Sequence, residues 1–436
     1  MSISISSQFD GGNIECTNCN SSEDIRLKIL PDAGGGFYQW FYFRMTAPAG
    51  NTYRLQIDNA ATSSYPDGWK NYQVVASYDQ TEWFRTDTTY NNGVLEFSIQ
   101  TNSDVVWFAY FTPYTMVRHN QLVSRCAVSA NASVEVLGHT VDGRDIDLIT
   151  IGDESKPLKI WSIARQHPGE PMAEWWMEGY LHKLLDTEDS VARALLDKAV
   201  FYVVPNMNPD GCFRGYLRTN AIGVNLNREW DKTTPEQSPE VFFVLEKMRE
   251  TGVSFNLDVH GDEALPYNFI AGTEGIHSWN DERLALQEMF KSNLMSINPD
   301  FQTKFGYPVS SPNSANYGIC SSFIAEQFNC PAMTLEMPFK DTVDSPDLQY
   351  GWSGGRSNKL GQSCVDAIYS IIDRLEDLLR SSVVAPTTLI KSSAFNSSCK
   401  PRFPPLTNMV EKSIAEMSTQ VLSICFCPTG LIPPTR

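Results

Sequence analysis

The sequence is poor in basic residues. Its 436 residues include 34 lysines and arginines against 51 aspartates and glutamates, so the net charge is −17. A protein that binds nucleic acid needs a basic face to replace the counterions of the phosphates, and binding to an anionic membrane surface makes a similar demand. The composition therefore argues against nucleic acid and against membranes as partners.

Long apolar runs are also missing. No stretch of eighteen apolar residues occurs, so we expect no transmembrane helix. Residues 1–7 contain neither the basic nor the apolar segment of a secretory signal. The ten cysteines do not have the density of a disulfide framework, and the spaced pair Cys16 and Cys19 has no second pair with which to form a metal site. We interpret them as reduced thiols and predict a cytoplasmic protein.

The first part of the chain has the pattern of a β domain. Up to about residue 114, short runs rich in aromatic and β-branched residues, such as Tyr53–Ile57 and Val94–Ile99, alternate with turn sequences. The Asn-Asn-Gly sequence at 91–93 is typical of a tight hairpin. We predict a β-sandwich domain over residues 1–125.

From about residue 133 the pattern changes to alternating strands and helices. The predicted strands lie at 158–163, 199–204, 253–259 and 333–335, and the predicted helices at 171–185, 239–249 and 365–380. This order indicates an α/β domain over residues 131–380, with a mixed, mostly parallel sheet flanked by helices. Residues 381–436 are rich in serine, threonine and proline without a sustained period, and we predict a disordered tail.

Histidine is scarce, so the positions of the six histidines are informative. His167 and Glu170 form an HxxE sequence between a predicted strand and a predicted helix, and His260 follows another strand. Ligands of open α/β sheets gather at the carboxyl ends of the strands. Imidazole nitrogens and carboxylate oxygens bind zinc, and three protein ligands leave the fourth position open, as in catalytic sites. Taken singly, His167 and Glu170 could be surface residues and His260 an ordinary buried histidine. Together the three residues predict a zinc site.

Further polar residues follow predicted strands or turns. Glu336 ends an apolar run, and a catalytic zinc site needs a base within hydrogen-bond reach, for which Glu263 is the next candidate. The sequence Asn-Met-Asn-Pro-Asp-Gly at 206–211 follows the predicted strand 199–204 and indicates a turn. Arg218 comes after this turn, and Arg228 stands beside the amide of Asn227. A guanidinium with a neighbouring amide suits bidentate recognition of a carboxylate.

The order of these motifs resembles the zinc metallocarboxypeptidases. The motifs are HPGE at 167–170, NPDG at 208–211, LNREW at 226–230, and then a histidine and a glutamate that each follow a strand. The likeness covers about residues 131–380. The β-rich start, with FDGGNIE at 9–15 and FTPY at 111–114, is similar to the N-terminal domain of the cytosolic carboxypeptidases.

The resemblance implies a zinc-dependent carboxypeptidase that acts on the C-terminus of a peptide or protein. It implies one Zn²⁺ per chain, bound by His167, Glu170 and His260. The other implied roles are these: Glu336 is the general base and acid toward a zinc-activated water, Arg218 polarises the scissile carbonyl, and Asn227 and Arg228 bind the terminal carboxylate.

Several points stay open at this stage. Arg214 lies four residues before Arg218 and competes for its role, and Tyr317 could correspond to the mobile tyrosine of the secreted relatives. Many relatives carry aspartate where this chain has Asn225, and an amide can accept the same hydrogen bond from a zinc-binding imidazole. The segment 305–335 contains no lysine or arginine, although relatives that remove C-terminal glutamate need positive charge there.

Two other functions compete with a carboxypeptidase, which could itself be a deglutamylase. The first is an aspartoacylase-like deacylase of N-acyl amino acids, whose family shares HxxE and a distant histidine but usually lacks the NPDG and LNREW wording. The second is a carboxypeptidase-like binding protein without catalysis, which typically loses a ligand or the base. Here all of these residues are present.

Overall fold

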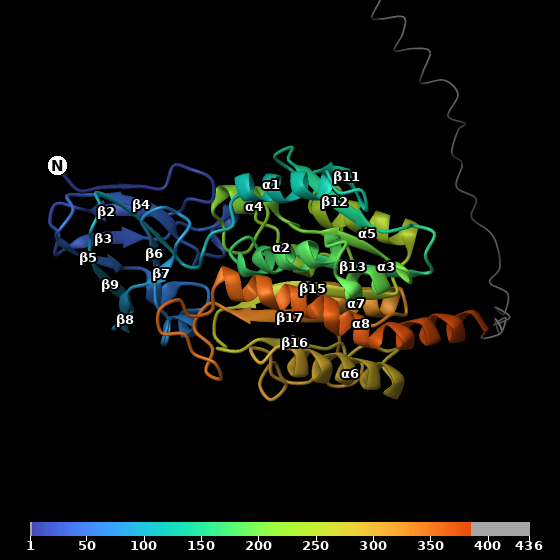
Figure 1. Ribbon diagram of the computed structural model, residues 1–436. Helices are drawn as coiled ribbons and strands as arrows, with labels where there is room; N and C mark the ends of the chain where they lie inside the picture. The colour runs from blue at the N-terminus through green and yellow to red at the C-terminus, as the bar shows by residue number, and fades with distance from the viewer. Residues whose placement is uncertain (1, 385–436) are drawn as a thin grey trace, which may run out of the picture. The chain divides into compact units, whose positions relative to one another are not determined.

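Two five-stranded sheets form the first part of the chain (Figure 1). The first has the order β1-β4-β10-β6-β7, with bounds Ser4–Ser6, Tyr42–Thr46, Val105–Ala109, Val75–Ser77 and Phe84–Arg85. The second has the order β2-β3-β5-β9-β8, with bounds Glu15–Asn18, Ile25–Lys28, Thr52–Ile57, Val94–Gln100 and Asp87–Asn91. The structure is a computed structural model that describes residues 2–384.

The two sheets pack face to face, as the predicted sandwich requires. Phe97 on β9 and Phe108 on β10 belong to different sheets, and their ring centroids are 5.4 Å apart. Both side chains are fully buried. The predicted hairpin joins β8 to β9, and its two central residues, Asn92 and Gly93, have φ angles of 51° and 85°. Two left-handed residues give a turn whose twist matches that of the strands.

A seven-stranded sheet forms the second part, in the order β11-β12-β14-β13-β15-β17-β16. The bounds are β11 Ala132–His139, β12 Asp145–Ile151, β13 Leu158–Ala164, β14 Ala199–Val204, β15 Phe255–Asp262, β16 Phe269–Ala271 and β17 Ala332–Pro338. The four central strands, β14, β13, β15 and β17, are parallel to one another. At one edge β12 pairs antiparallel with β14 and β11 with β12, and at the other edge β16 pairs antiparallel with β17. The sheet is therefore mixed, with a parallel centre.

Helices cover both faces of this sheet (Figure 1). Their bounds are α1 Met116–Ala127, α2 Met172–Leu185, α3 Ser190–Leu196, α4 Pro209–Arg214, α5 Pro239–Thr251, α6 Asp281–Ile297, α7 Cys320–Gln327 and α8 Gly354–Val384. Alternate residues of β13 show the two faces: Leu158 and Ile160 belong to the core with α2, α6 and α8, whereas Trp161 and Ile163 belong to the core with α5 and α7. Burial on both faces explains the continuous apolar run of this strand.

Several elements differ from the sequence-based prediction. β15 and β17 continue past their predicted ends, so His260 and Glu336 lie within strands and face each other as a register pair. The predicted turn at NPDG is the first part of α4, and α8 begins eleven residues before the predicted start. α8 also includes residues 381–384 of the predicted tail, whereas 385–436 lie outside the described residues. We propose residues 1–125 and 131–380 as the two domains.

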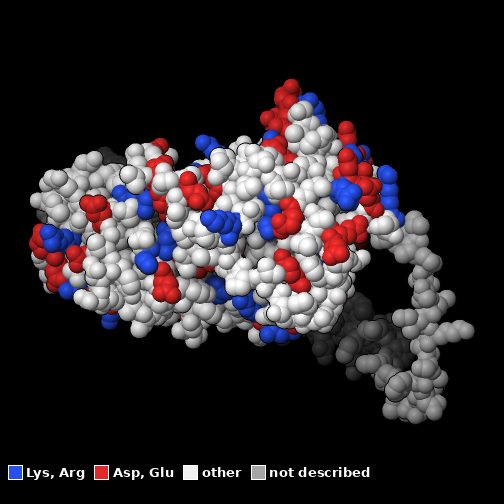
Figure 2. Space-filling view, turned by 90° about the horizontal axis from the view of Figure 1, so that it is seen from below, with Lys and Arg blue, Asp and Glu red and all other residues white. Residues whose placement is uncertain are grey.

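Within the described part of the chain, no helix has the length and hydrophobicity needed to span a bilayer. On the face shown in Figure 2, basic side chains occur in small groups among acidic and uncharged ones.

Candidate active site

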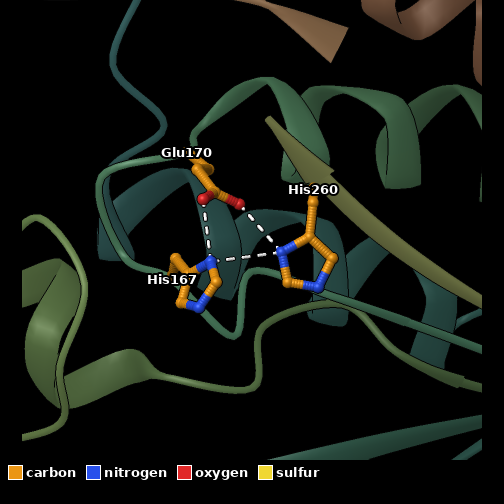
Figure 3. Close-up of side chains that lie close together, drawn as sticks. All are labelled: His167, Glu170 and His260. Carbon is orange, nitrogen blue, oxygen red and sulfur yellow. Dashed lines mark hydrogen bonds and ion pairs between the residues drawn. The ribbon is translucent and has the colours of Figure 1, made fainter. Parts of the chain in front are cut away.

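The three predicted zinc ligands converge at the centre of the parallel strands. His167 and Glu170 lie in the loop between β13 and α2, and His260 lies on the neighbouring strand β15 (Figure 3). Nδ1 of His167 is 2.8 Å from Oε1 of Glu170 and 3.2 Å from Nδ1 of His260, which is 3.0 Å from Oε2 of Glu170. All three side chains are buried.

Hydrogen bonds on the far side of each ring fix the tautomer of both histidines. Nε2 of His167 is 3.2 Å from Oδ1 of Asn225, and Nε2 of His260 is 2.9 Å from Oδ2 of Asp258. Because these oxygens only accept hydrogen bonds, each Nε2 carries a hydrogen, so the lone pair of the neutral ring is on Nδ1. Asn225 therefore contacts His167 through its amide oxygen, the contact that the sequence analysis considered for this residue in place of an aspartate. Burial alone would lower the pKa of His260, but Asp258 and Glu170 raise it well above its ordinary value.

When both imidazoles are neutral, their Nδ1 lone pairs and the carboxylate of Glu170 repel one another, and a cation among them offsets this repulsion. Two imidazole nitrogens and a carboxylate oxygen are the ligand types of catalytic zinc sites, so the residues present fit Zn²⁺. Burial lowers the pKa of His167 to about 4, with Arg218 adding to the effect, which keeps this imidazole neutral as a ligand must be. Burial alone would raise the pKa of Glu170, but the adjacent His167 and His260 lower it.

Glu336 lies beside this group on β17, as the register partner of His260. Its Oε1 accepts a hydrogen bond of 3.3 Å from the hydroxyl of Tyr307, and its buried Oε2 has no hydrogen-bond partner in the part of the chain that the structure describes. Burial raises the pKa of Glu336 well above its ordinary value, although His260 lowers it. A buried carboxylate with a free oxygen and a raised pKa has the properties of a general base near neutral pH.

Tyr307 was not found from the sequence. Its hydroxyl lies 2.7 Å from Oδ2 of Asp262 and also reaches Glu336. It belongs to the irregular segment between α6 and α7, where no periodicity or motif distinguishes one tyrosine from another. Tyr317, the tyrosine that the sequence suggested, instead contacts the backbone of His277 and does not line the cavity described next.

A cavity of about 830 Å³ opens over these residues. Its lining includes the three converging residues, His167, Glu170 and His260. It also includes Glu336, Glu263, Arg218, Asn227, Arg228, Tyr65 and Tyr307. Arg214 is not among the lining residues, because its guanidinium makes two hydrogen bonds of 2.8 Å to the carboxylate of Asp142. The structure therefore brings Arg218, and not Arg214, to the site.

Among the described residues, neither Arg218 nor Arg228 has a carboxylate within 4 Å of its guanidinium. Burial, together with Arg218, lowers the pKa of Arg228. Asn227 is held beside it, since its Oδ1 accepts a hydrogen bond of 2.8 Å from the backbone of Cys320. Two unpaired guanidinium groups in one cavity of an acidic protein indicate an anionic ligand.

A buried charge cluster supports the loop that carries His167. Nδ1 of His119 on α1 is 2.7 Å from Oε1 of Glu174 on α2, and its Nε2 is 3.1 Å from Oδ2 of Asp147. Arg165, two residues before His167, donates to the other oxygen of Glu174 at 2.7 Å. Burial alone would lower the pKa of His119, but Glu174 and Asp147 raise it to about 9.

This cluster predicts how the stability depends on pH. A histidine whose pKa rises from 6.5 to about 9 on folding stabilises the protein fully below about pH 6.5, and this stabilisation is lost as the pH rises through about 9. The difference corresponds to about 3 kcal/mol. We expect urea denaturation to show a smaller loss of stability between pH 6 and 9.5 in His119→Gln than in the native chain. His139→Gln, at an exposed histidine, is the matched control, and equal pH slopes in all three proteins would refute the assignment.

Comparison with known proteins agrees with this fold and site. Residues 5–111 match the family described as "Cytosolic carboxypeptidase N-terminal domain", and residues 125–351 match "Zinc carboxypeptidase". The structure of a metallo-carboxypeptidase from Pseudomonas aeruginosa, in complex with (2-guanidinoethylmercapto)succinic acid, is 42% identical with a TM-score of 0.83, over 85% of this chain and 100% of that one. A metallo-carboxypeptidase from Burkholderia cenocepacia is 42% identical with a TM-score of 0.82, over 86% of this chain and 100% of that one.

Cytosolic carboxypeptidase 3 of Bos taurus is 27% identical over 334 residues, which are 67% of this chain and 32% of that longer protein. A fold with these two domains and this site defines a metallopeptidase. The chain belongs to the zinc carboxypeptidase family, in its cytosolic carboxypeptidase branch, as the motifs predicted.

Proposed function

We propose that this chain is a zinc-dependent carboxypeptidase that removes residues from the free C-terminus of peptides or proteins. The observation that carries the proposal is that one cavity contains both a buried ligand set for zinc and two arginines that, among the described residues, pair with no carboxylate. A hydrolase of internal bonds needs only the first of these features. A site that recognises a terminal carboxylate needs the second as well.

His167, Glu170 and His260 would hold one Zn²⁺ per chain. When bound, Zn²⁺ supplies Lewis-acid chemistry, which polarises a carbonyl group and makes water acidic enough to ionise near neutral pH. Glu336 accepts a proton from the attacking water and donates it to the leaving amine; its Oε2, which has no hydrogen-bond partner within residues 2–384, is the oxygen that takes the proton. Tyr307 and the surrounding apolar strands keep this carboxylate oriented and largely out of bulk water.

The arginines act on the two negative charges of the reaction. Arg218 stabilises the oxyanion that forms on the scissile carbonyl oxygen, since a cation held in a fixed position interacts favourably with negative charge that develops beside it. Arg228 and Asn227 bind the terminal carboxylate of the substrate, for which the fork of a guanidinium is suited. The division of roles follows the order of the family motifs.

The partner and location follow from the same reasoning. We propose the C-terminus of a peptide or protein as the substrate, with no nucleic acid or membrane partner. Relatives of this chain are named cytosolic carboxypeptidases, and we propose the cytoplasm for this chain too.

We propose a C-terminal glutamate as the preferred substrate end. The segment 305–335 adds no basic residue, but Lys304, just before it, and Lys291 on α6 line the cavity. Lys291 also pairs with Glu288 at 2.7 Å, which leaves Lys304 as the stronger candidate for a contact with the glutamate side chain. Lys340, which follows β17, donates instead to the backbone of Lys70 and is not a lining residue. The net charge of −17 opposes an acidic substrate at long range, and salt screens that repulsion over a Debye length of about 8 Å.

The proposal predicts a strict need for a free C-terminus. Peptides that end in Glu, Leu or Lys, each as the free acid and as the amide, are compared by mass spectrometry of the products. We expect release of the last residue from the free acids and a kcat/KM at least ~10²-fold lower for the amides, because the amide offers no negative charge to the guanidinium of Arg228 in the cavity. Glutamate should be preferred, and increasingly so at high salt.

Arg228→Gln should lose most of the discrimination between acid and amide. Arg214→Gln is the matched control, because this arginine pairs with Asp142 outside the cavity.

Equal cleavage of free acids and amides by the native chain would refute the exopeptidase activity. Hydrolysis of N-acyl amino acids alone would favour the deacylase, and no turnover of any substrate by zinc-loaded protein would favour the binding protein. A preference for Leu at both salt concentrations would reject only the deglutamylase.

A further inference from the structure

The segment that carries Arg218 is held by the N-terminal β domain. The backbone of Gly11 donates to the carbonyl of Phe213 at 2.9 Å, and Nδ2 of Asn13 donates to the carbonyl of Gly215 at 2.8 Å. At the far end of the segment, a Cβ on Gly223 would lie 2.5 Å from the carbonyl oxygen of Ala33. The two parts of the chain therefore touch closely along the whole segment from 213 to 223.

The centre of this contact is the carboxylate of Asp32. Its Oδ1 accepts a hydrogen bond of 2.7 Å from the backbone of Leu217, and its Oδ2 accepts bonds of 2.8 and 2.9 Å from the backbones of Arg218 and Thr219. The hydroxyl of Thr219 adds a fourth bond, of 3.0 Å. Three successive amides that point at one anion form a nest, and this nest leaves Asp32 only 3% exposed.

The same domain also encloses the side chain of Arg218. Its guanidinium carbon lies 5.6 Å from the ring centroid of Phe37 and 5.6 Å from that of Tyr65, and both rings belong to the β domain. A guanidinium beside aromatic faces is attracted to them and restricted in its rotamers. Tyr65 itself lines the cavity. The β domain therefore contacts both the backbone and the charged group of Arg218.

We propose that Asp32 is a positioning residue for Arg218, so that the N-terminal domain completes the active site of the catalytic domain. The inference rests on the proposed role of Arg218 at the scissile carbonyl. An oxyanion-stabilising group must point at the place where charge develops, and a shift of about 1 Å can cost about 10²-fold in rate. The carboxylate of Asp32 fixes the three amides around Arg218 at the point where its side chain leaves the backbone.

A double-mutant cycle on the full chain separates positioning from a general loss of stability. In Asp32→Asn an amide group replaces one acceptor and faces N–H donors. We expect kcat to fall by about 10²-fold, with KM changed by less than about threefold and one zinc still bound per chain. Arg218→Ala should lower kcat by about 10²–10³-fold. In the Arg218→Ala background, Asp32→Asn should cost less than about threefold more, because nothing remains to be positioned.

Asp79→Asn is the matched control, since this carboxylate accepts two backbone amides at 2.8 Å within the β domain alone and should leave kcat unchanged. Thr219→Val provides a milder test if Asp32→Asn folds poorly: it removes one hydrogen bond to Asp32 and should lower kcat several-fold in the native background only. Additive losses in the cycle, or a normal kcat in both Asp32→Asn and Thr219→Val, would overturn the inference. A normal kcat in Arg218→Ala would instead contradict the proposed role of Arg218.

Discussion

Glu336→Gln is expected to lower kcat by about 10²–10⁴-fold, the range that general acid–base catalysis typically contributes, while zinc stays bound. Glutamine has nearly the same shape as glutamate, so at position 336 of β17 it can keep the contact with Tyr307. It cannot accept the proton of the attacking water. Because Glu336 is not one of the three converging ligands, the metal content should remain that of the native chain.

Glu263→Gln is the control for this experiment. Glu263 lines the same cavity, is also buried, and has a pKa that burial raises well above its ordinary value, so burial and charge alone do not distinguish it from Glu336. Only Glu336 faces His260 as a register partner. We expect steady-state kinetics to show most of the native kcat in Glu263→Gln. The reverse pattern, with near-normal turnover in Glu336→Gln, would place the base on Glu263.

The convergence of His167, Glu170 and His260 could be predicted from the sequence because the signal is local. His167 and Glu170 lie three residues apart, between a strand and a helix whose apolar patterns are clear. His260 and Glu336 come from neighbouring parallel strands, and such strands bring their carboxyl ends to the same edge. The strand ends themselves were placed too early, since Gly261 and Asp262 do not have the apolar pattern that marked the strand.

Contacts between the two domains could not be predicted in this way. Asp32 and the amides that it binds are 185 to 187 residues apart. An aspartate before a glycine-rich stretch is also typical of a simple turn, so the sequence around Asp32 does not indicate a contact with a distant segment. The bonds depend on how two separately folded parts meet, which no periodicity records. Tyr307 was missed for a related reason, because irregular segments are positioned by their contacts and not by their own pattern.

Glycine caused the error in α8. Its start is rich in glycine, which is unfavourable within a helix, so the prediction began at residue 365. In the structure these glycines allow α8 to approach α2. A Cβ on Gly361 would lie 2.1 Å from the carbonyl oxygen of Trp176, and one on Gly179 would lie 1.9 Å from that of Asn358. Close packing of the two helices outweighs the local cost.

The NPDG motif shows a signal that was present but misinterpreted. Asn208 caps α4 by accepting a hydrogen bond of 3.0 Å from the backbone of Gly211, and Pro209 occupies the first helical position. Asparagine followed by proline is a favourable start of a helix as well as of a turn. The sequence alone did not decide between them.

Loss of either histidine ligand is expected to abolish zinc binding at the site and, with it, the peptidase activity. In His260→Ala or His167→Ala only two of the three converging ligands remain, and the change should weaken zinc binding by more than the ~10–100-fold typical of losing an outer-shell partner. His277→Ala, at an exposed histidine, is the matched control.

The most direct measurement is the zinc content per chain, determined by elemental analysis on the same preparations whose peptidase activity is assayed. The native chain and His277→Ala should contain about one zinc each and be active. His167→Ala and His260→Ala should contain little zinc and be inactive. Stoichiometric zinc in both ligand variants, or full activity in a chain stripped of metal, would contradict the assignment of this site as the catalytic zinc centre.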